Sequence, residues 1–120
     1  MAVDQNAVLN CWEIKRLEWM LDAARIPFVF TRRFDHPIKK GQSSYQLEYP
    51  VSSLSNRYER VCSVIQGYGT YGMEENKLEI MGLTEPWKTI DGGVLGYLTA
   101  EDVYDRIRKH WEEHHTEYGQ

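Results

Sequence analysis

Near the N-terminus, apolar residues recur at steps of three and four, which is the spacing of one face of an α-helix. This stripe consists of Ala7, Cys11, Ile14, Leu17, Leu21 and Ala24. Asp4 is a suitable N-cap for such a helix, and Pro27 disfavours helical dihedrals at Ile26. We therefore predict a helix over residues 4–25, with the apolar stripe facing the core.

The middle of the chain has the two-residue alternation of β-strands. Residues 28–34 and 45–49 alternate between two faces, and residues 59–66 are rich in β-branched side chains. Residues 77–81 show a weaker strand pattern, and a short strand or bridge over residues 94–98 follows a turn-rich segment. We expect three or four mostly antiparallel strands.

A second helix is predicted near the end of the sequence. Thr99 and Asp102 have the spacing of a capping box, which marks the first turn of a helix. The inward stripe of this helix consists of Ala100, Val103, Ile107 and Trp111. In residues 113–120 we expect the end of the helix to fray.

This order of elements predicts a two-layer α+β sandwich in which both helices cover one face of the sheet. A length of 120 residues suits one domain, and 42% hydrophobic residues are enough for one core. Cys11 and Cys62 lie within apolar patterns, so we expect them to be buried free thiols. We treat residues 1–120 as a single domain.

The charge of the chain argues against general nucleic-acid binding. The formal net charge is −4 and the two signs are interspersed, so no broad basic surface is available to neutralise phosphates. The N-terminus also lacks the pattern of a signal peptide, and no apolar run approaches the roughly 20 residues that cross a bilayer. We expect no membrane association and a cytoplasmic location.

The segment His110–His114 matches the H-x-x-E-H pattern of inverted zinc peptidases. His110 and His114 lie one helical turn apart, so they can share a metal ion beside Glu113. Only six residues follow His114, whereas such enzymes take a third ligand from further along the chain. The helical wheel also places both histidines at the edge of the core stripe. We expect no metal cofactor, and a zinc hydrolase is the weakest alternative.

Gly67–Gly72 is a loop rich in glycine and tyrosine between two predicted strands. The loop lacks the Gly-Lys-Ser/Thr of a phosphate-binding loop and the helix that follows a dinucleotide fingerprint. Tyr68 and Tyr71 have ring faces on which a base or a peptide side chain can stack. A hairpin loop that binds nothing is the plainer interpretation.

Arginines provide a possible anion pocket beside this loop, because guanidinium groups bind phosphate or carboxylate through paired hydrogen bonds. They are Arg32, Arg33, Arg57 and Arg60. Arg32 and Arg33 fall on opposite faces of their predicted strand, so at least one is interpreted as a solvated edge charge. An alternative function is therefore the sequestration of a small nucleotide or another anion.

Trp12 and Trp19 are seven residues apart and share a face of the first helix with Val8, nearly opposite the core stripe. Tryptophan is enriched at binding hot spots, so a second apolar stripe indicates an interface with a partner or a second copy. The intramolecular alternative is that the C-terminal segment, with Trp111 and Tyr118, covers this stripe.

Two long strings, GTYGMEENKLEIMGL (residues 69–83) and GGVLGYLTAEDVYDRIRKHWEEH (residues 92–114), resemble small uncharacterised proteins encoded by phages and prophages of Firmicutes. The string MLDAARIPF (residues 20–28) is similar too, and the resemblance covers about half of the chain. It implies an accessory phage protein in a bacterial cytoplasm. That group includes inhibitors of host defence and regulators that act by binding.

The sequence contains no specific Ser-His-Asp, Cys-His or paired-carboxylate arrangement. We therefore expect a non-enzymatic protein without a cofactor. It is expected to bind a host protein partner, or itself, through Val8, Trp12 and Trp19, and to modulate or inhibit host defence. The nucleotide or anion domain and the zinc hydrolase stay open as alternatives.

Overall fold

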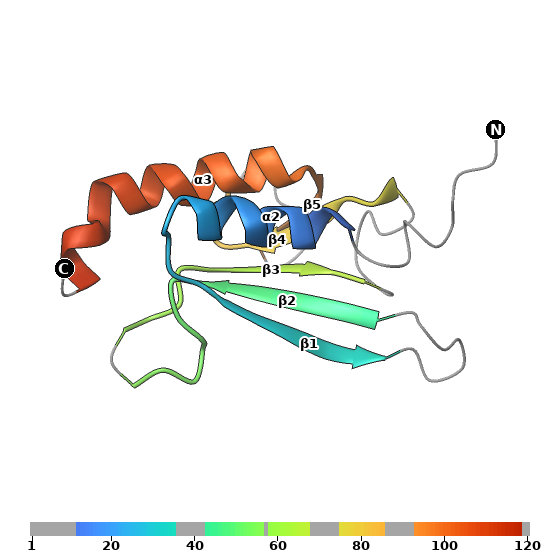
Figure 1. Ribbon diagram of the computed structural model, residues 1–120, viewed down its shortest axis with the longest axis horizontal. Helices are drawn as coiled ribbons and strands as arrows, with labels where there is room; N and C mark the ends of the chain where they lie inside the picture. The colour runs from blue at the N-terminus through green and yellow to red at the C-terminus, as the bar shows by residue number, and fades with distance from the viewer. Residues whose placement is uncertain (1–11, 36–42, 57, 68–74, 86–92, 119–120) are drawn as a thin grey trace.

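The computed structural model describes residues 12–35, 43–56, 58–67, 75–85 and 93–118. Its elements follow in the order α2 (Trp12–Ala23), β1 (Val29–Asp35), β2 (Ser43–Tyr49), β3 (Cys62–Gln66), β4 (Leu78–Met81), β5 (Val94–Leu98), α3 (Ala100–His114) and the 3₁₀ helix η3 (His115–Tyr118). Both α-helices lie on the same side of the sheet (Figure 1). The predicted α+β sandwich is confirmed.

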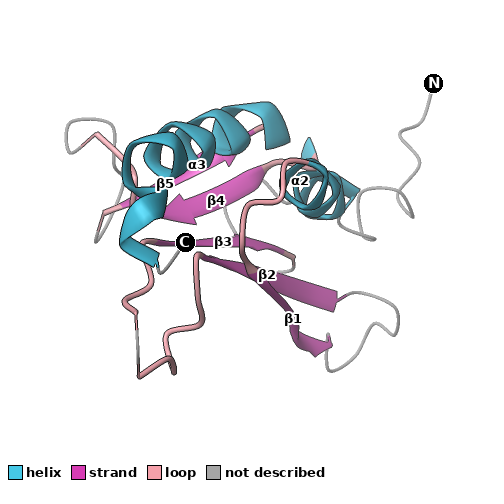
Figure 2. Ribbon diagram, turned by 60° about the vertical axis from the view of Figure 1, so that its left-hand side comes forward, coloured by secondary structure: helices cyan, strands magenta, loops and turns pink. Residues whose placement is uncertain are grey.

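The strands of the described residues form one antiparallel sheet in the order β1-β2-β3-β4-β5. We expected three or four strands, and the sheet has five because Val94–Leu98 pairs with Leu78–Met81 along its length. Alternation places Leu47, Val64 and Ile80 on the helix-covered face, where each is fully buried. β1 is an edge strand and lies furthest from α3 (Figure 2).

The core lies between the sheet and the two α-helices. The inward stripes of the helices are fully buried, as predicted, at Ile14, Leu17, Leu21, Ala100, Val103 and Ile107. The prediction was wrong for Ala24, which is exposed because α2 ends before it, and Trp111 is only partly buried. The predicted capping box is present at the start of α3, where the side chains of Thr99 and Asp102 each accept a hydrogen bond from the other's N–H. Cys62 is a buried free thiol, and Cys11 lies outside the described residues. Residues 115–118, where we expected fraying, are helical.

Helix α2 ends at Ala23, slightly earlier than predicted. The N–H of Ile26 donates to the carbonyl of Leu21 at 3.0 Å, and the N–H of Arg25 donates to the carbonyl of Asp22 at 3.1 Å. This is a Schellman motif, and Arg25 has the left-handed φ of 58° that the motif requires. The predicted start of the helix, with Asp4 as its cap, lies outside the described residues.

The first described turn of α2 is held to the sheet by two side-chain amides. Gln66 is fully buried, and its Oε1 accepts a hydrogen bond from the N–H of Ile14 at 2.9 Å. Its Nε2 donates to Oδ1 of Asn76 at 2.8 Å, and the same Oδ1 accepts from the N–H of Glu13 at 3.3 Å. Because N–H groups in the first turn of a helix lack acceptors within the helix, these amides cap it from a distance. They fix how α2 is rotated on the sheet.

A second set of contacts holds α2 against α3. Oε2 of Glu13 accepts a hydrogen bond from the N–H of Ala100 at 2.6 Å, in the first turn of α3. Arg16 forms ion pairs with Glu13 and with Glu101. These polar contacts join the first turns of the two helices above the shared core, and on the sheet α2 contacts β2 and β3.

Candidate functional site

Trp12 and Trp19 lie on the solvent side of α2. Their exposed fractions are 49% and 68%, whereas Ile14, Leu17 and Leu21 on the opposite side of the helix are fully buried. A buried aromatic side chain such as tryptophan removes about 150–250 Å² of surface from water, which stabilises a fold or a complex. The described part of the chain thus leaves two large aromatic rings on one helix in contact with solvent.

Trp12, Lys15 and Trp19 follow one another at steps of three and four, and we call these three residues the tryptophan face. This is the spacing with which one helix presents side chains to another helix in a coiled coil. Glu18 lies at the flank of the face, three residues beyond Lys15. The surface therefore combines two aromatic rings with a positive and a negative charge.

The tryptophan face continues onto the sheet through Lys15. Its Nζ lies 5.7 Å from the ring centroid of Trp12 and 5.2 Å from that of Tyr45 on β2, both within the range of a cation–π contact. Tyr45 in turn stacks on Phe30 of β1, with ring centroids 5.6 Å apart and an interplanar angle of 23°. Lys15 and the rings of Tyr45 and Phe30 extend the aromatic surface from the helix to the edge of the sheet.

Carboxylates gather beside this surface on α2. Partial burial raises the pKa of Glu18, the neighbouring carboxylate of Asp22 raises it further, and Lys15 acts in the opposite direction. Asp22 forms no ion pair with any residue that the structure describes. A cation supplied from outside would relieve the repulsion between the two carboxylates.

The intramolecular alternative is not realised among the described residues. Trp111 packs partly buried against the core, and its ring centroid lies 5.3 Å from that of His115, while Trp12 and Trp19 stay exposed. Val8, the third residue of the predicted interface, lies outside the described residues. The interface stays a prediction, with the exposure of both tryptophans in its favour.

The predicted anion site falls only partly within the described residues. Tyr68, Tyr71 and Arg57 lie outside them. The backbone of Arg32 is paired with Tyr45, which is paired with Gln66, the last residue of β3 before the glycine and tyrosine loop. Two strand spacings put the backbone of Arg32 roughly 10 Å from Gln66. Arg32 is thus at the same end of the sheet as the loop.

Arg60 and Gly67 serve the fold. Nη1 of Arg60 lies 3.0 Å from Oε2 of Glu48, a carboxylate that is only 5% exposed, so the guanidinium neutralises a buried charge. Arg60 precedes β3 and Gly67 follows it, which places them at opposite ends of the strand. A Cβ on Gly67 would come within 2.3 Å of the Cα of Ser44, so this position requires glycine.

His110 and His114 share one face of α3, as predicted, with ring centroids 4.4 Å apart. Nδ1 of His110 shares a hydrogen bond of 2.7 Å with the hydroxyl of the buried Tyr49, and Nδ1 of His114 lies 3.3 Å from Glu117. Burial lowers the pKa of His110, and His114 lowers it further. Within the described residues, no group of three or more His, Cys, Asp or Glu is arranged to hold a metal ion. His110 fits the interpretation of a histidine at the core edge.

Two residues of the aromatic surface around Trp12 and Trp19 were not predicted from the sequence. Lys15 could have been found from the steps of three and four that join it to Trp12 and Trp19. Tyr45 has no such signal, because it reaches the surface only through the placement of β2 beside α2.

Comparison with known proteins assigns no family. No protein-family model, no curated protein and no solved structure matches the chain. The resemblance to phage and prophage proteins therefore stays a prediction. In the ranges that the structure describes, no helix has the length and apolar character needed to cross a membrane.

Proposed function

We propose that this protein is a non-enzymatic binding protein whose interface is the tryptophan face, and that its partner is a second copy of the chain. The observation that carries the proposal is the exposure of Trp12 and Trp19, at 49% and 68%, on a helix anchored firmly by its other sides. Tryptophan is enriched among the interface residues whose replacement by alanine costs about 2 kcal/mol or more of binding free energy.

The charges of α2 suit a two-fold pairing. In a symmetric dimer, residue i of one copy meets residue j of the other, and j meets i. An antiparallel second α2 places Lys15 of each copy opposite Glu18 of the other. The same register brings Trp12 of one copy within about two residues, or roughly 3 Å along the axis, of Trp19 of the other. Lys15 of the second copy thus adds a positive charge opposite Glu18, whose pKa is raised by burial and by Asp22.

A host protein, as the phage resemblance implies, would use the same surface and compete with the second copy. The two alternative functions have weaker support. The guanidinium of Arg60 is already paired with Glu48, and the described residues contain no third metal ligand beside His110 and His114.

The test is sedimentation velocity on the wild type and on the double variant Trp12→Ser/Trp19→Ser. We expect a dimer for the wild type and a monomer for the variant, with unchanged circular dichroism. The matched control is Leu54→Ser/Met81→Ser, because these residues are exposed by 87% and 48% and lie outside α2. This control should stay dimeric. Unfolding of the tryptophan variant would show that Trp12 and Trp19 belong to the core and would refute the interface.

A further inference from the structure

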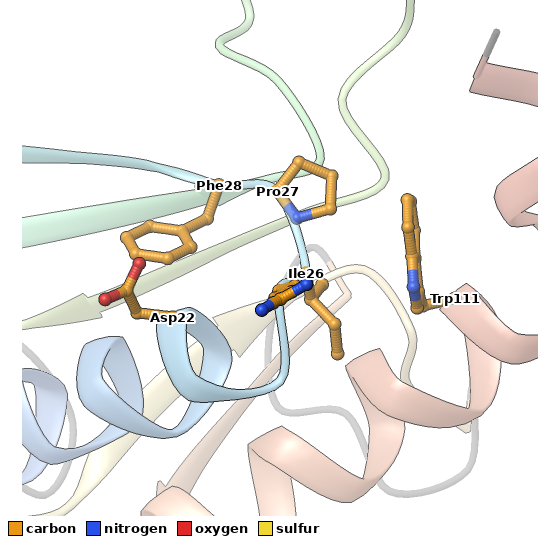
Figure 3. A pocket seen from close by; sticks show the side chains of 6 residues that line it. Asp22, Ile26, Pro27, Phe28 and Trp111 are labelled. Carbon is orange, nitrogen blue, oxygen red and sulfur yellow. The ribbon is translucent and has the colours of Figure 1, made fainter. Parts of the chain in front are cut away.

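A pocket of about 380 Å³ opens between the C-terminal end of α2 and the last turns of α3. Its lining consists of Asp22, Arg25, Ile26, Pro27, Phe28 and Trp111. Figure 3 shows the carboxylate of Asp22 beside the ring of Phe28, and Trp111 facing them from α3 across Pro27 and Ile26. The pocket thus has two aromatic side walls, an apolar floor and charged groups of both signs.

The two charged side chains of the pocket, Asp22 and Arg25, are exposed to solvent. Among the described residues, neither Asp22 nor Arg25 forms a side-chain hydrogen bond or an ion pair, and they are not paired with each other. One carboxylate and one guanidinium therefore line the same small space, and no described residue is paired with either. A ligand that carries both a cation and an anion complements this arrangement and adds no net charge.

The backbone of Arg25 supports a role for its side chain. Its φ of 58° lies in the left-handed region, where a residue with a Cβ is strained and where glycine is the usual residue at the end of a helix. Glycine would keep both hydrogen bonds of the Schellman motif. Strained residues recur at functional sites, which makes Arg25 a candidate for a functional side chain.

We infer that this pocket binds a free α-amino acid with a large apolar side chain. Its carboxylate contacts the guanidinium of Arg25, its ammonium group contacts the carboxylate of Asp22, and its side chain packs between Phe28 and Trp111. Guanidinium groups bind carboxylates through two parallel hydrogen bonds, and aromatic walls suit an apolar or aromatic side chain. The volume lies at the lower end of the range for small-molecule pockets, about 300–1,000 Å³, which fits a ligand of this size.

A nucleotide fits the pocket less well. Its phosphates carry two or more negative charges, which would lie beside Asp22 with a single guanidinium to neutralise them. An α-amino acid carries one charge of each sign on two groups bonded to the same carbon, so it complements one carboxylate and one guanidinium.

The first experiment is isothermal titration calorimetry of the full chain with L-phenylalanine and with L-leucine. We expect saturable binding of both. Two analogues test the charged contacts: 3-phenylpropionate lacks the ammonium group and phenethylamine lacks the carboxylate. Each should bind at least about tenfold more weakly than L-phenylalanine, because one hydrogen bond to a charged group is lost. Absence of saturable binding up to about 10 mM of either amino acid, ten times the Kd of a complex worth about 4 kcal/mol, would overturn the inference.

Variants of the charged residues separate binding from folding. Arg25→Gly keeps the left-handed backbone and removes the guanidinium, so it should weaken L-phenylalanine binding at least about tenfold while the melting temperature stays equal or rises. Asp22→Asn should weaken binding similarly. Arg108→Ala is the matched control: it removes the same charge from an exposed position on α3 outside the pocket and should bind like the wild type. Unchanged binding by Arg25→Gly would refute the assignment.

The position of the site can be read from the tryptophan indole signals in an NMR titration. L-phenylalanine should shift the indole N–H signal of Trp111 and leave those of Trp12 and Trp19 in place, and the opposite pattern would refute the pocket. The variant Trp12→Ser/Trp19→Ser should bind the amino acid with the affinity of the wild type. The pocket and the proposed dimer interface can therefore fail independently.

Discussion

Replacing Gln66 with leucine would remove the buried amide that holds the first turn of α2 on the sheet. The N–H of Ile14 would lose its acceptor at 2.9 Å, and an unsatisfied buried donor costs about 1–3 kcal/mol. Asn76 would lose a donor at 2.8 Å, which costs about 1 kcal/mol. Better burial of leucine offsets about 1 kcal/mol. We expect a net loss of about 2 kcal/mol, or about 8 °C in melting temperature.

Urea unfolding followed by circular dichroism measures this loss. The midpoint should fall while the m-value stays unchanged, since the native surface is the same. Gln46→Leu is the matched control, because Nε2 of Gln46 donates to Oγ of Ser63 at 2.8 Å and no backbone N–H of a described residue donates to its side chain. The control should lose less than about 1 kcal/mol. Equal losses in the two variants would refute the idea that Gln66 anchors the helix that carries the tryptophan face.

Further predictions concern titration, reactivity and backbone strain. The pKa of His110 is lowered from its ordinary value of 6.5, so the unfolded chain takes up a proton at a higher pH than the folded chain does. The free energy of unfolding should therefore be highest above pH 6.5, fall as the pH drops below 6.5, and level off below the folded pKa. His110→Asn should flatten this part of a urea-unfolding series between pH 8 and about pH 5. Burial raises the pKa of the Cys62 thiol to about 12. In the variant Cys11→Ser, Cys62 should therefore react with a thiol reagent at pH 8 only after the protein unfolds. Fast labelling of the native variant would contradict this prediction. Gly67→Ala should lower the free energy of unfolding by about 3 kcal/mol through steric overlap and strain, and a stability like that of the wild type would show that the backbone moves freely there.

The elements that the sequence predicts well are those with local signals. The capping box of Thr99 and Asp102 and the stripe of α3 lie within a few residues of each other, so they can be read directly from the chain. β5 is harder, because Gly96 interrupts its pattern, Tyr97 has a φ of 62°, and its pairing with β4 shifts register. The end of α2 was placed too late, since a left-handed Arg25 rather than Pro27 terminates the helix.

The site was predictable only in part, for a related reason. Exposure of the two tryptophans follows from helical spacing, which is local. The partners of Arg60 and His110 do not follow from local spacing. Glu48 and Tyr49 are distant in the sequence and contact Arg60 and His110, respectively, only in the folded chain. Because of these contacts, Arg60 and His110 contribute to the fold, although the sequence made them candidates for ligand binding.

The proposed interface is tested most directly by native mass spectrometry of a mixture of unlabelled and ¹⁵N-labelled protein. At about 100 μM, roughly a hundred times the Kd of a complex worth about 8 kcal/mol, the account predicts a dimer of intermediate mass that contains one chain of each kind. It also predicts that labelled Trp12→Ser/Trp19→Ser forms no such species with the wild type. A wild type that is entirely monomeric under these conditions, or a mixed dimer that survives both substitutions, would contradict the account.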